Sequence, residues 1–141
     1  MRVIYGKSKT GKTTEMIKQF ANSENSLFIS NEVYGSAFIH FYKKLGFTLN
    51  PESNNRFGYS EIETLDDIKN LIKDYNYRTV FIDNTKLIQK YPLEKLKQFE
   101  AECKINLVLS AQLNRNAEKK LDMIELWWKE GLVKNGTIKI C

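Results

Sequence analysis

The sequence predicts an α/β fold in which helices flank a mostly parallel β-sheet. Apolar or β-prone runs alternate with helical patterns along the chain, and this alternation is typical of such folds. The first of these runs leads directly into a glycine-containing loop and then into a helix. Near the end of the chain, Asn135-Gly136 separates two β-prone runs and is a strong hairpin signal. We therefore expect a parallel sheet that ends in a C-terminal β-hairpin with an antiparallel edge.

Four runs are predicted to be the strands of the parallel part. They cover residues 2–5, 27–30, 79–83 and 105–110. The tail adds β-prone runs at 132–134 and 137–140, one on each side of the Asn-Gly pair. The stretch 50–58 is rich in Asn and also contains Pro, Ser and Gly, so it is predicted to be irregular.

Two helices are predicted in the first third of the chain. The first covers about residues 12–22 and follows the glycine-containing loop. The second covers about residues 34–45, and Gly46 is placed at the C′ position, where a glycine commonly ends a helix.

Two further helices are predicted after the irregular stretch. Thr64 and Asp67 resemble a capping box, with Asp in place of the usual Glu. Pro92 suits the first turn of another helix that runs to about Glu102. The apolar residues behind the capping box repeat with helical spacing and form one face: Leu65, Ile68, Leu71 and Ile72.

Length and composition restrict the remaining possibilities. The 141 residues are expected to form one domain, spanning 1–141, because this length supports a single hydrophobic core. No stretch is apolar enough to span a membrane and no signal-peptide core precedes the loop, so we expect a cytoplasmic protein. Cys103 and Cys141 lack a metal-binding spacing and are expected to be reduced thiols. The net charge of +5 fits a polyanion partner, although surface lysines alone would also produce it.

Residues 6–13 match the complete phosphate-binding pattern G-x-x-x-x-G-K-[ST]. Their position between a predicted strand and a predicted helix distinguishes them from a chance match. The residues expected to bind the phosphates of ATP are Gly6, Lys7, Ser8, Lys9, Thr10, Gly11, Lys12 and Thr13, together with Thr14 after them.

The residue types in this loop suit phosphate chemistry. Gly6 and Gly11 let the backbone curl without Cβ clashes, so that N–H groups and the helix N-terminus face the phosphates. Lys12 can reach the β- and γ-phosphates, and the Thr13 hydroxyl can ligate Mg²⁺. The loop therefore predicts ATP and Mg²⁺ as ligands.

A second motif is Asp83, which ends the predicted strand 79–83. Open α/β sheets bind ligands outside the carboxyl ends of their strands. A carboxylate there can hold Mg²⁺ or a water bound to it, as in the Walker B element. Asn84 follows at the position where many ATPases carry a catalytic Glu, so the catalytic base is expected elsewhere or is missing.

The segment Ser30-Asn31-Glu32, after the predicted strand 27–30, resembles a segment of the RecA-like ATPases, and within them of the DnaB-type replicative helicases. In that family a Ser-x-Glu follows the second strand, and its Glu activates the attacking water. The resemblance implies that Glu32 is the catalytic base.

A third segment, Leu109 to Arg115, looks like the part of the same family in which a strand runs into Ser-Gln-Leu-Asn-Arg, with Ala111 as an additional residue here. The family's Gln senses the γ-phosphate and relays its state to the loops that bind nucleic acid. The resemblance implies this role for Gln112.

Together these segments imply a RecA-like P-loop ATPase whose strands, numbered along the chain, lie in the order 5-1-4-3-2. They also imply action on nucleic acid, DNA rather than RNA, as a helicase, translocase, loader or packaging motor. Sites of this family are completed between subunits, so a homo-oligomer is expected. The hairpin around Lys134 is the candidate segment for reaching a neighbouring subunit, although the Arg that usually follows in the family is missing here.

Two other classes of function remain open. The run from Gly11 to Glu15 also resembles thymidine kinases, which would make this a small nucleoside or nucleotide kinase. The sequence contains neither the zinc-binding cysteines nor the Arg-rich lid of those kinases. A nucleotide-dependent assembly switch without motor activity is the other alternative.

Overall fold

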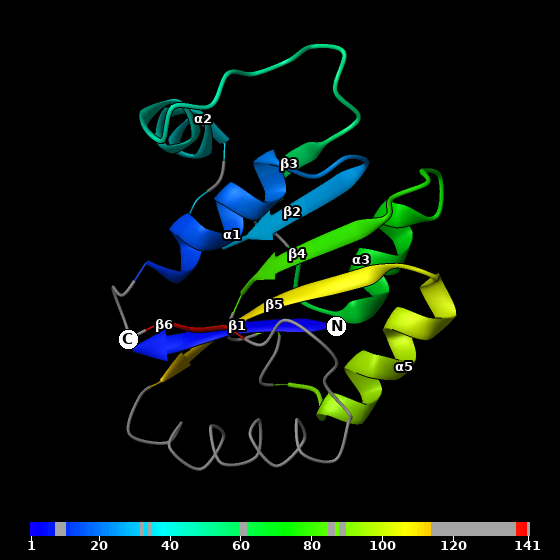
Figure 1. The fold of residues 1–141 in the computed structure, drawn as a ribbon. Coiled ribbons are helices and arrows are strands. Elements are labelled where there is room, and N and C mark those ends of the chain that lie inside the picture. The colour runs from blue at the N-terminus through cyan, green and yellow to red at the C-terminus, as the bar shows by residue number, and fades with distance from the viewer. Residues whose placement is uncertain are drawn as a thin grey trace.

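The computed structural model describes residues 1–7, 11–31, 33, 35–59, 62–84, 87, 90–113 and 138–140. In these residues a single β-sheet lies between two layers of helices (Figure 1). This arrangement confirms the α/β class predicted from the alternation of strands and helices.

The described strands form one sheet in the order β3-β2-β4-β5-β1-β6, and every pairing between them is parallel. Because the strands are parallel, all their carboxyl ends lie at the same end of the sheet. The strands are β1 (Arg2–Lys7), β2 (Ser26–Ser30), β3 (Arg56–Tyr59), β4 (Thr79–Asp83), β5 (Asn106–Leu113) and β6 (Ile138–Ile140).

The edge next to β1 differs from the prediction. β6 pairs with β1 in parallel, from Ile4↔Ile138 to Gly6↔Ile140, where an antiparallel edge was expected. The Asn-Gly signal is local and describes only how two tail segments meet, so it does not determine how the last of them pairs with β1. The hairpin turn and its first strand lie outside the described residues.

The strand at the opposite edge of the sheet was not predicted from the sequence. The predicted irregular stretch 50–58 runs into β3, which pairs with β2 and shifts register between Phe28 and Ile29. β3 has only four residues and includes Gly58, so its own strand preference is weak. Hydrogen bonding to the edge of β2 therefore decides its conformation.

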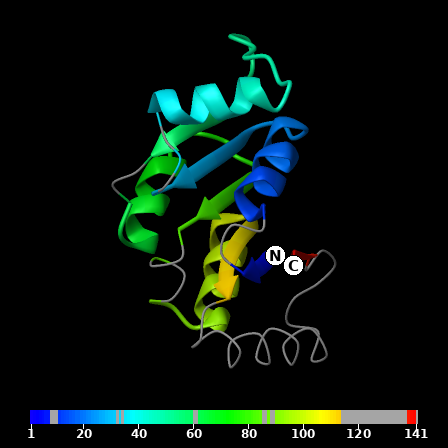
Figure 2. The same ribbon diagram turned by 90° about the vertical axis from the view of Figure 1, so that its left-hand side faces the viewer.

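Helices cover both faces of the sheet (Figure 2). The helices are α1 (Lys12–Ala21), α2 (Gly35–Lys44), α3 (Leu65–Ile72) and α5 (Leu93–Cys103). α1 and α2 lie on one face, and α3 and α5 lie on the other (Figures 1 and 2). No helix within the described ranges is long and apolar enough to cross a bilayer.

Alternate residues of the strands supply the two halves of the core. Strand residues toward α1 and α2 are Ile4, Phe28, Phe81 and Val108. Strand residues toward α3 and α5 are Leu27, Ile29, Val80, Ile82, Leu107 and Leu109. Because both faces are buried, a shift of one residue in any central strand would exchange the two sets, and the register is therefore strongly specified.

Aromatic rings fill the core beneath α1 and α2. The ring centroid of Phe20 lies 5.5 Å from that of Phe28 and 5.8 Å from those of Phe38 and Phe81, all edge to face. Edge-to-face pairs at this spacing are favourable beyond the area they bury. This cluster fixes α1, whose first turn contains Thr13 of the predicted phosphate-binding pattern, against β2 and β4.

Local signals set the helix ends largely as predicted. Gly46 has a φ of +92°, its N–H donates to Lys43 O at 2.9 Å, and the N–H of Phe47 donates to Tyr42 O at 3.2 Å. This is the Schellman pattern that ends a helix at a left-handed glycine. The capping box of Thr64 and Asp67 is confirmed in both directions.

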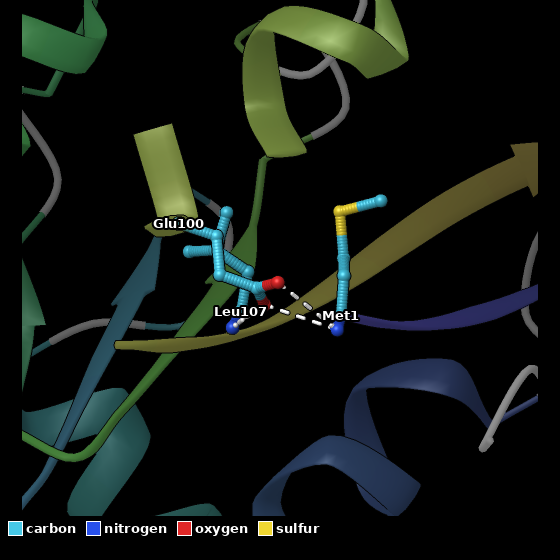
Figure 3. Close-up of polar contacts among 3 residues, drawn as sticks. All are labelled: Met1, Glu100 and Leu107. Carbon is cyan, nitrogen blue, oxygen red and sulfur yellow. Dashed lines mark hydrogen bonds and ion pairs between the residues drawn. The ribbon is translucent and has the colours of Figure 1, made fainter. Parts of the chain in front are cut away.

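Pro92 differs slightly from its prediction, since it occupies the N-cap of α5 and not its first turn. Farther along this helix, the Glu100 carboxylate joins three elements. Its Oε2 accepts a hydrogen bond from the backbone N–H of Leu107 in β5 at 2.8 Å and lies 3.1 Å from the amino group of Met1 (Figure 3). These contacts attach α5 to the strands beside it.

At Asp67, hydrogen bonds from the backbone N–H groups of Glu63 and Thr64 lower the pKa of the carboxyl. A carboxyl with a lowered pKa stabilises the fold above its unfolded-state pKa, and this stabilisation is lost as the pH falls through its folded-state pKa. We expect Asp67→Asn to lower the Tm near neutral pH, and the difference from wild type to shrink in the acidic range below the ordinary carboxyl pKa. Thermal unfolding followed by circular dichroism as a function of pH measures this.

Asp66→Asn is the matched control, because Asp66 lies in the same first turn and is exposed but outside the capping box. Both variants remove one negative charge near the helix N-terminus. If the two variants lose the same Tm at every pH, the capping hydrogen bonds of Asp67 do not provide the stabilisation.

Candidate phosphate-binding site

Polar side chains replace apolar ones toward the carboxyl ends of three neighbouring strands. Ser30 ends β2, Asp83 ends β4 and Ser110 lies in β5, and all three are buried. Each follows by two residues a core residue of the α1 face, namely Phe28, Phe81 and Val108. Since side chains alternate along a strand, the three polar residues lie on the same face as α1. Figure 1 shows the three strands pointing toward the same end of the sheet.

Two hydroxyl groups hold the carboxylate of Asp83. Thr13 Oγ1 donates to Asp83 Oδ2 at 2.8 Å, and Ser110 Oγ donates to Asp83 Oδ1 at 2.7 Å. Asp83 is only 7% exposed. Thr13 is the last residue of the phosphate-binding pattern, so the structure brings together the two motifs that the sequence predicts to share a site.

Gly11 sets the start of α1. It has a φ of +95° and a ψ of 21°, a left-handed conformation that favours glycine. Its carbonyl accepts the N–H of Glu15 at 3.0 Å, and as the N-cap residue Gly11 provides no side chain to cap the helix. The first N–H groups of an α-helix have no partner within the helix and attract anions. The expectation that Gly11 permits a sharp turn into the helix agrees with this geometry.

The other loop residues are placed unevenly. Gly6 and Lys7 belong to β1, where Gly6 is in register with Gln112 and Lys7 with Leu113, so the strand extends beyond the predicted 2–5. Lys12 and Thr14 lie half-buried in the first turn of α1. The remaining predicted loop residues, Ser8, Lys9 and Thr10, lie outside the described residues.

The predicted catalytic residues are only partly described. Gln112 lies in β5, which extends to Leu113 instead of ending at residue 110. Glu32 lies outside the described residues, two positions after the end of β2, and Lys134 lies outside them as well. Of the predicted site residues, the structure brings Thr13 and Asp83 together.

Asn84 has a structural role on the face of the sheet that α3 and α5 cover. Its Oδ1 accepts the N–H of Leu87 at 3.1 Å, and its Nδ2 donates to Ile62 O at 3.4 Å. Ile62 and Leu87 pack in the core beneath α3 and α5. Asn84 therefore links Leu87 to Ile62 on the face of α3 and α5, opposite the face of Asp83.

The contact between Ser110 and Asp83 was not predicted. The signal available in the sequence was a serine at the end of an otherwise apolar strand, on a strand expected to lie beside that of Asp83. Ser30 has a similar place on the other side of β4, where it is in register with Asp83. Its Oγ accepts the N–H of Val33 at 3.0 Å, which turns the chain after β2.

The site offers hard oxygen ligands to a cation. The Thr13 hydroxyl has one proton, which it donates to Asp83, so its oxygen lone pairs can still face a metal ion. Within the described ranges, no cluster of three or more His, Cys, Asp or Glu residues could hold a metal by itself. These oxygens therefore fit an ion such as Mg²⁺ that keeps its waters and takes further oxygens from a phosphate.

A cavity among the described residues lies at the opposite end of the sheet from Asp83. It measures about 500 Å³ and lies between the end of α1, the end of α2 and the loop 48–55. Asn25, which precedes β2, and Asn55, which precedes β3, help to line it. Ser30 and Asp83 lie at the other ends of their strands, so this cavity does not adjoin the Asp83 site.

Comparison of the sequence with models of known protein families finds no match, and comparison with curated proteins finds none either.

Proposed function

We propose that this protein is a RecA-like P-loop ATPase that binds ATP with Mg²⁺ and hydrolyses it. The observation that carries the proposal is the 2.8 Å hydrogen bond from Thr13 Oγ1 to Asp83 Oδ2. It joins the last residue of the phosphate-binding pattern to the acid at the end of β4, across 70 residues of chain. A chance match to the pattern would need no such acid beside it.

The surroundings of this pair suit a metal-bound triphosphate. The start of α1 favours the negative phosphates, and Lys12 supplies a positive charge in the same turn. Thr13 would hold Mg²⁺ through its hydroxyl oxygen, and Asp83 would hold a water bound to the ion. When bound, the ion supplies charge neutralisation at the phosphate oxygens.

The order of the strands also supports the RecA-like assignment. β5 pairs with β1 on one side and with β4 on the other. It thus lies between the strand that leads into the loop and the strand that ends in Asp83, as the resemblance implies for the strand that carries Gln112. In the proposed reaction, Glu32 activates the attacking water and Gln112 senses the γ-phosphate.

The proposed work of the ATPase is on nucleic acid, with DNA favoured over RNA. The support is the resemblance to DnaB-type helicases and the net charge of +5. In the same proposal, a homo-oligomer completes each site, and the segment around Lys134 supplies a cation to a neighbour's γ-phosphate. A kinase requires an acceptor site beside the γ-phosphate, and the cavity near the end of α1 lies at the opposite end of the sheet from Asp83.

The first test removes the point charge of the loop. Lys12→Ala is expected to abolish ATP binding or hydrolysis while the far-UV circular dichroism stays that of wild type, because Lys12 is proposed to bind the β- and γ-phosphates. Lys18→Ala is the control, since Lys18 is an exposed lysine farther along the same helix. Hydrolysis by Lys12→Ala at the wild-type rate would falsify the proposed site.

A second test separates the base from the metal-binding acid. Glu32→Gln should keep ATP binding and slow hydrolysis by roughly 10²-fold or more, as expected when a general base is lost. Asp83→Asn should instead raise the Mg²⁺ concentration that hydrolysis requires, because the amide can still form hydrogen bonds but lacks the charge that holds the ion. Steady-state rates of ATP hydrolysis, measured over a range of Mg²⁺ concentrations, distinguish the two variants. Unchanged turnover in Glu32→Gln would place the base on another residue.

A third test concerns the partners. Sedimentation with ATP and single-stranded DNA at low salt should show an oligomer with the strand bound. This binding should weaken steeply as salt is added, because contacts with phosphates release condensed counterions. Double-stranded DNA and RNA of the same length are the comparisons. A strictly monomeric particle with no strand bound would contradict the motor and leave a kinase or a switch.

A further inference from the structure

The orientation of the Asp83 carboxylate must be fixed by its neighbours. The terminal torsion of an aspartate side chain is broad, so rotation about its Cβ–Cγ bond is easy unless both oxygens have partners. Thr13 holds Oδ2 from α1, and Ser110 holds Oδ1 from β5. The two hydroxyls therefore hold one carboxylate oxygen each, and together they restrict rotation of the carboxylate.

Ser110 is well placed to be the rigid one of the two partners. It is 1% exposed and lies in a central strand, in register with Ile4 of β1. The neighbouring pairs Phe81↔Val108 and Ile82↔Leu109 hold β5 against β4 just before the Asp83 position. Thr13, in contrast, lies in the first turn of a helix, at the edge where a ligand is proposed to bind.

We infer that Ser110 is a positioning residue that orients Asp83 for the metal bound to the nucleotide. The inference rests on the proposed function. Ser110 does not touch the ligand in this scheme. Its hydroxyl keeps Oδ1 occupied and turned away from the site, so that Oδ2 remains directed toward Thr13 and the ion. A carboxylate released on the Oδ1 side would rotate and hold the ion less tightly.

The test is the Mg²⁺ concentration that supports half-maximal binding of a fluorescent, non-hydrolysable ATP analogue. Ser110→Ala is expected to raise it by about 10-fold, at the lower end of the usual loss when a partner of a metal-binding group is removed. Ser110→Thr keeps a hydroxyl and should restore a value near that of wild type. Excess Mg²⁺ should restore binding to Ser110→Ala, since its fold and its loop are intact.

Ser26→Ala is the matched control, because Ser26 is also a fully buried serine in a strand of this sheet. It lies at the amino end of β2, and its Oγ donates to Glu24 O at 3.3 Å, away from Asp83. If Ser110 had only a structural role, Ser110→Ala would behave like Ser26→Ala. It would lower the Tm or the fraction of protein that binds the analogue, and the Mg²⁺ midpoint would stay at its wild-type value. Thermal unfolding of both variants measures that effect separately.

The outcomes separate the inference from the proposed function. If wild type binds the analogue with a Mg²⁺ requirement and Ser110→Ala has the same midpoint as Ser26→Ala, the positioning role is wrong and the ATPase stands. If Ser110→Thr does not fold, the difference in Mg²⁺ midpoint between Ser110→Ala and Ser26→Ala is sufficient to test the positioning role. If wild type binds no nucleotide at any Mg²⁺ concentration, both the ATPase and the role of Ser110 are overturned.

Discussion

The candidate site depends on one buried carboxylate. Asp83 ends a strand that is buried from Val80 onward, and a carboxylate in such a place is costly unless hydrogen bonds satisfy it. Thr13 and Ser110 supply those bonds from a helix and from a neighbouring strand. The requirement therefore links α1, β4 and β5 at the end of the sheet where the phosphate-binding pattern lies. Loss of this carboxylate would remove the hydrogen bond that joins Thr13 to β4.

The packing of the core explains why Thr13, Asp83 and Ser110 lie close together. The aromatic cluster of Phe20, Phe28, Phe38 and Phe81 sets the position of α1 over β2 and β4. Two residues farther along each strand, the same face changes from apolar to polar. Side chains two residues apart in a strand lie on the same face, so the burial of a core phenylalanine also places the site residue two positions later on the face of α1. The packing of the core therefore also determines the geometry of the site.

The sequence predicted the features that depend on local or strongly periodic signals. The α/β class, the capping box at Thr64 and the end of α2 at Gly46 are examples. It did not predict β3 or the direction of β6, because both depend on pairing with a distant strand. The segment of β3 also has a weak strand preference of its own. For the site, the loop and Asp83 were visible as motifs. The contact of Ser110 with Asp83 was not predictable, because a serine near the end of a strand is common in proteins without a functional role. Only the register of β5 against β4 makes Ser110 a partner of Asp83.

The charges at this end of the sheet point to a particular form of ligand. The start of α1 attracts anions, whereas a carboxylate 2.8 Å from the hydroxyl of its first turn repels them. Hydroxyl donors orient that carboxylate but do not cancel its charge. A bare phosphate would meet opposing effects here, while a phosphate that carries Mg²⁺ would satisfy both groups at once. The combination of Gly11, Thr13 and Asp83 is thus better suited to a metal–nucleotide complex than to a free anion, and this is the physical reason for preferring a nucleotide site to a general anion site.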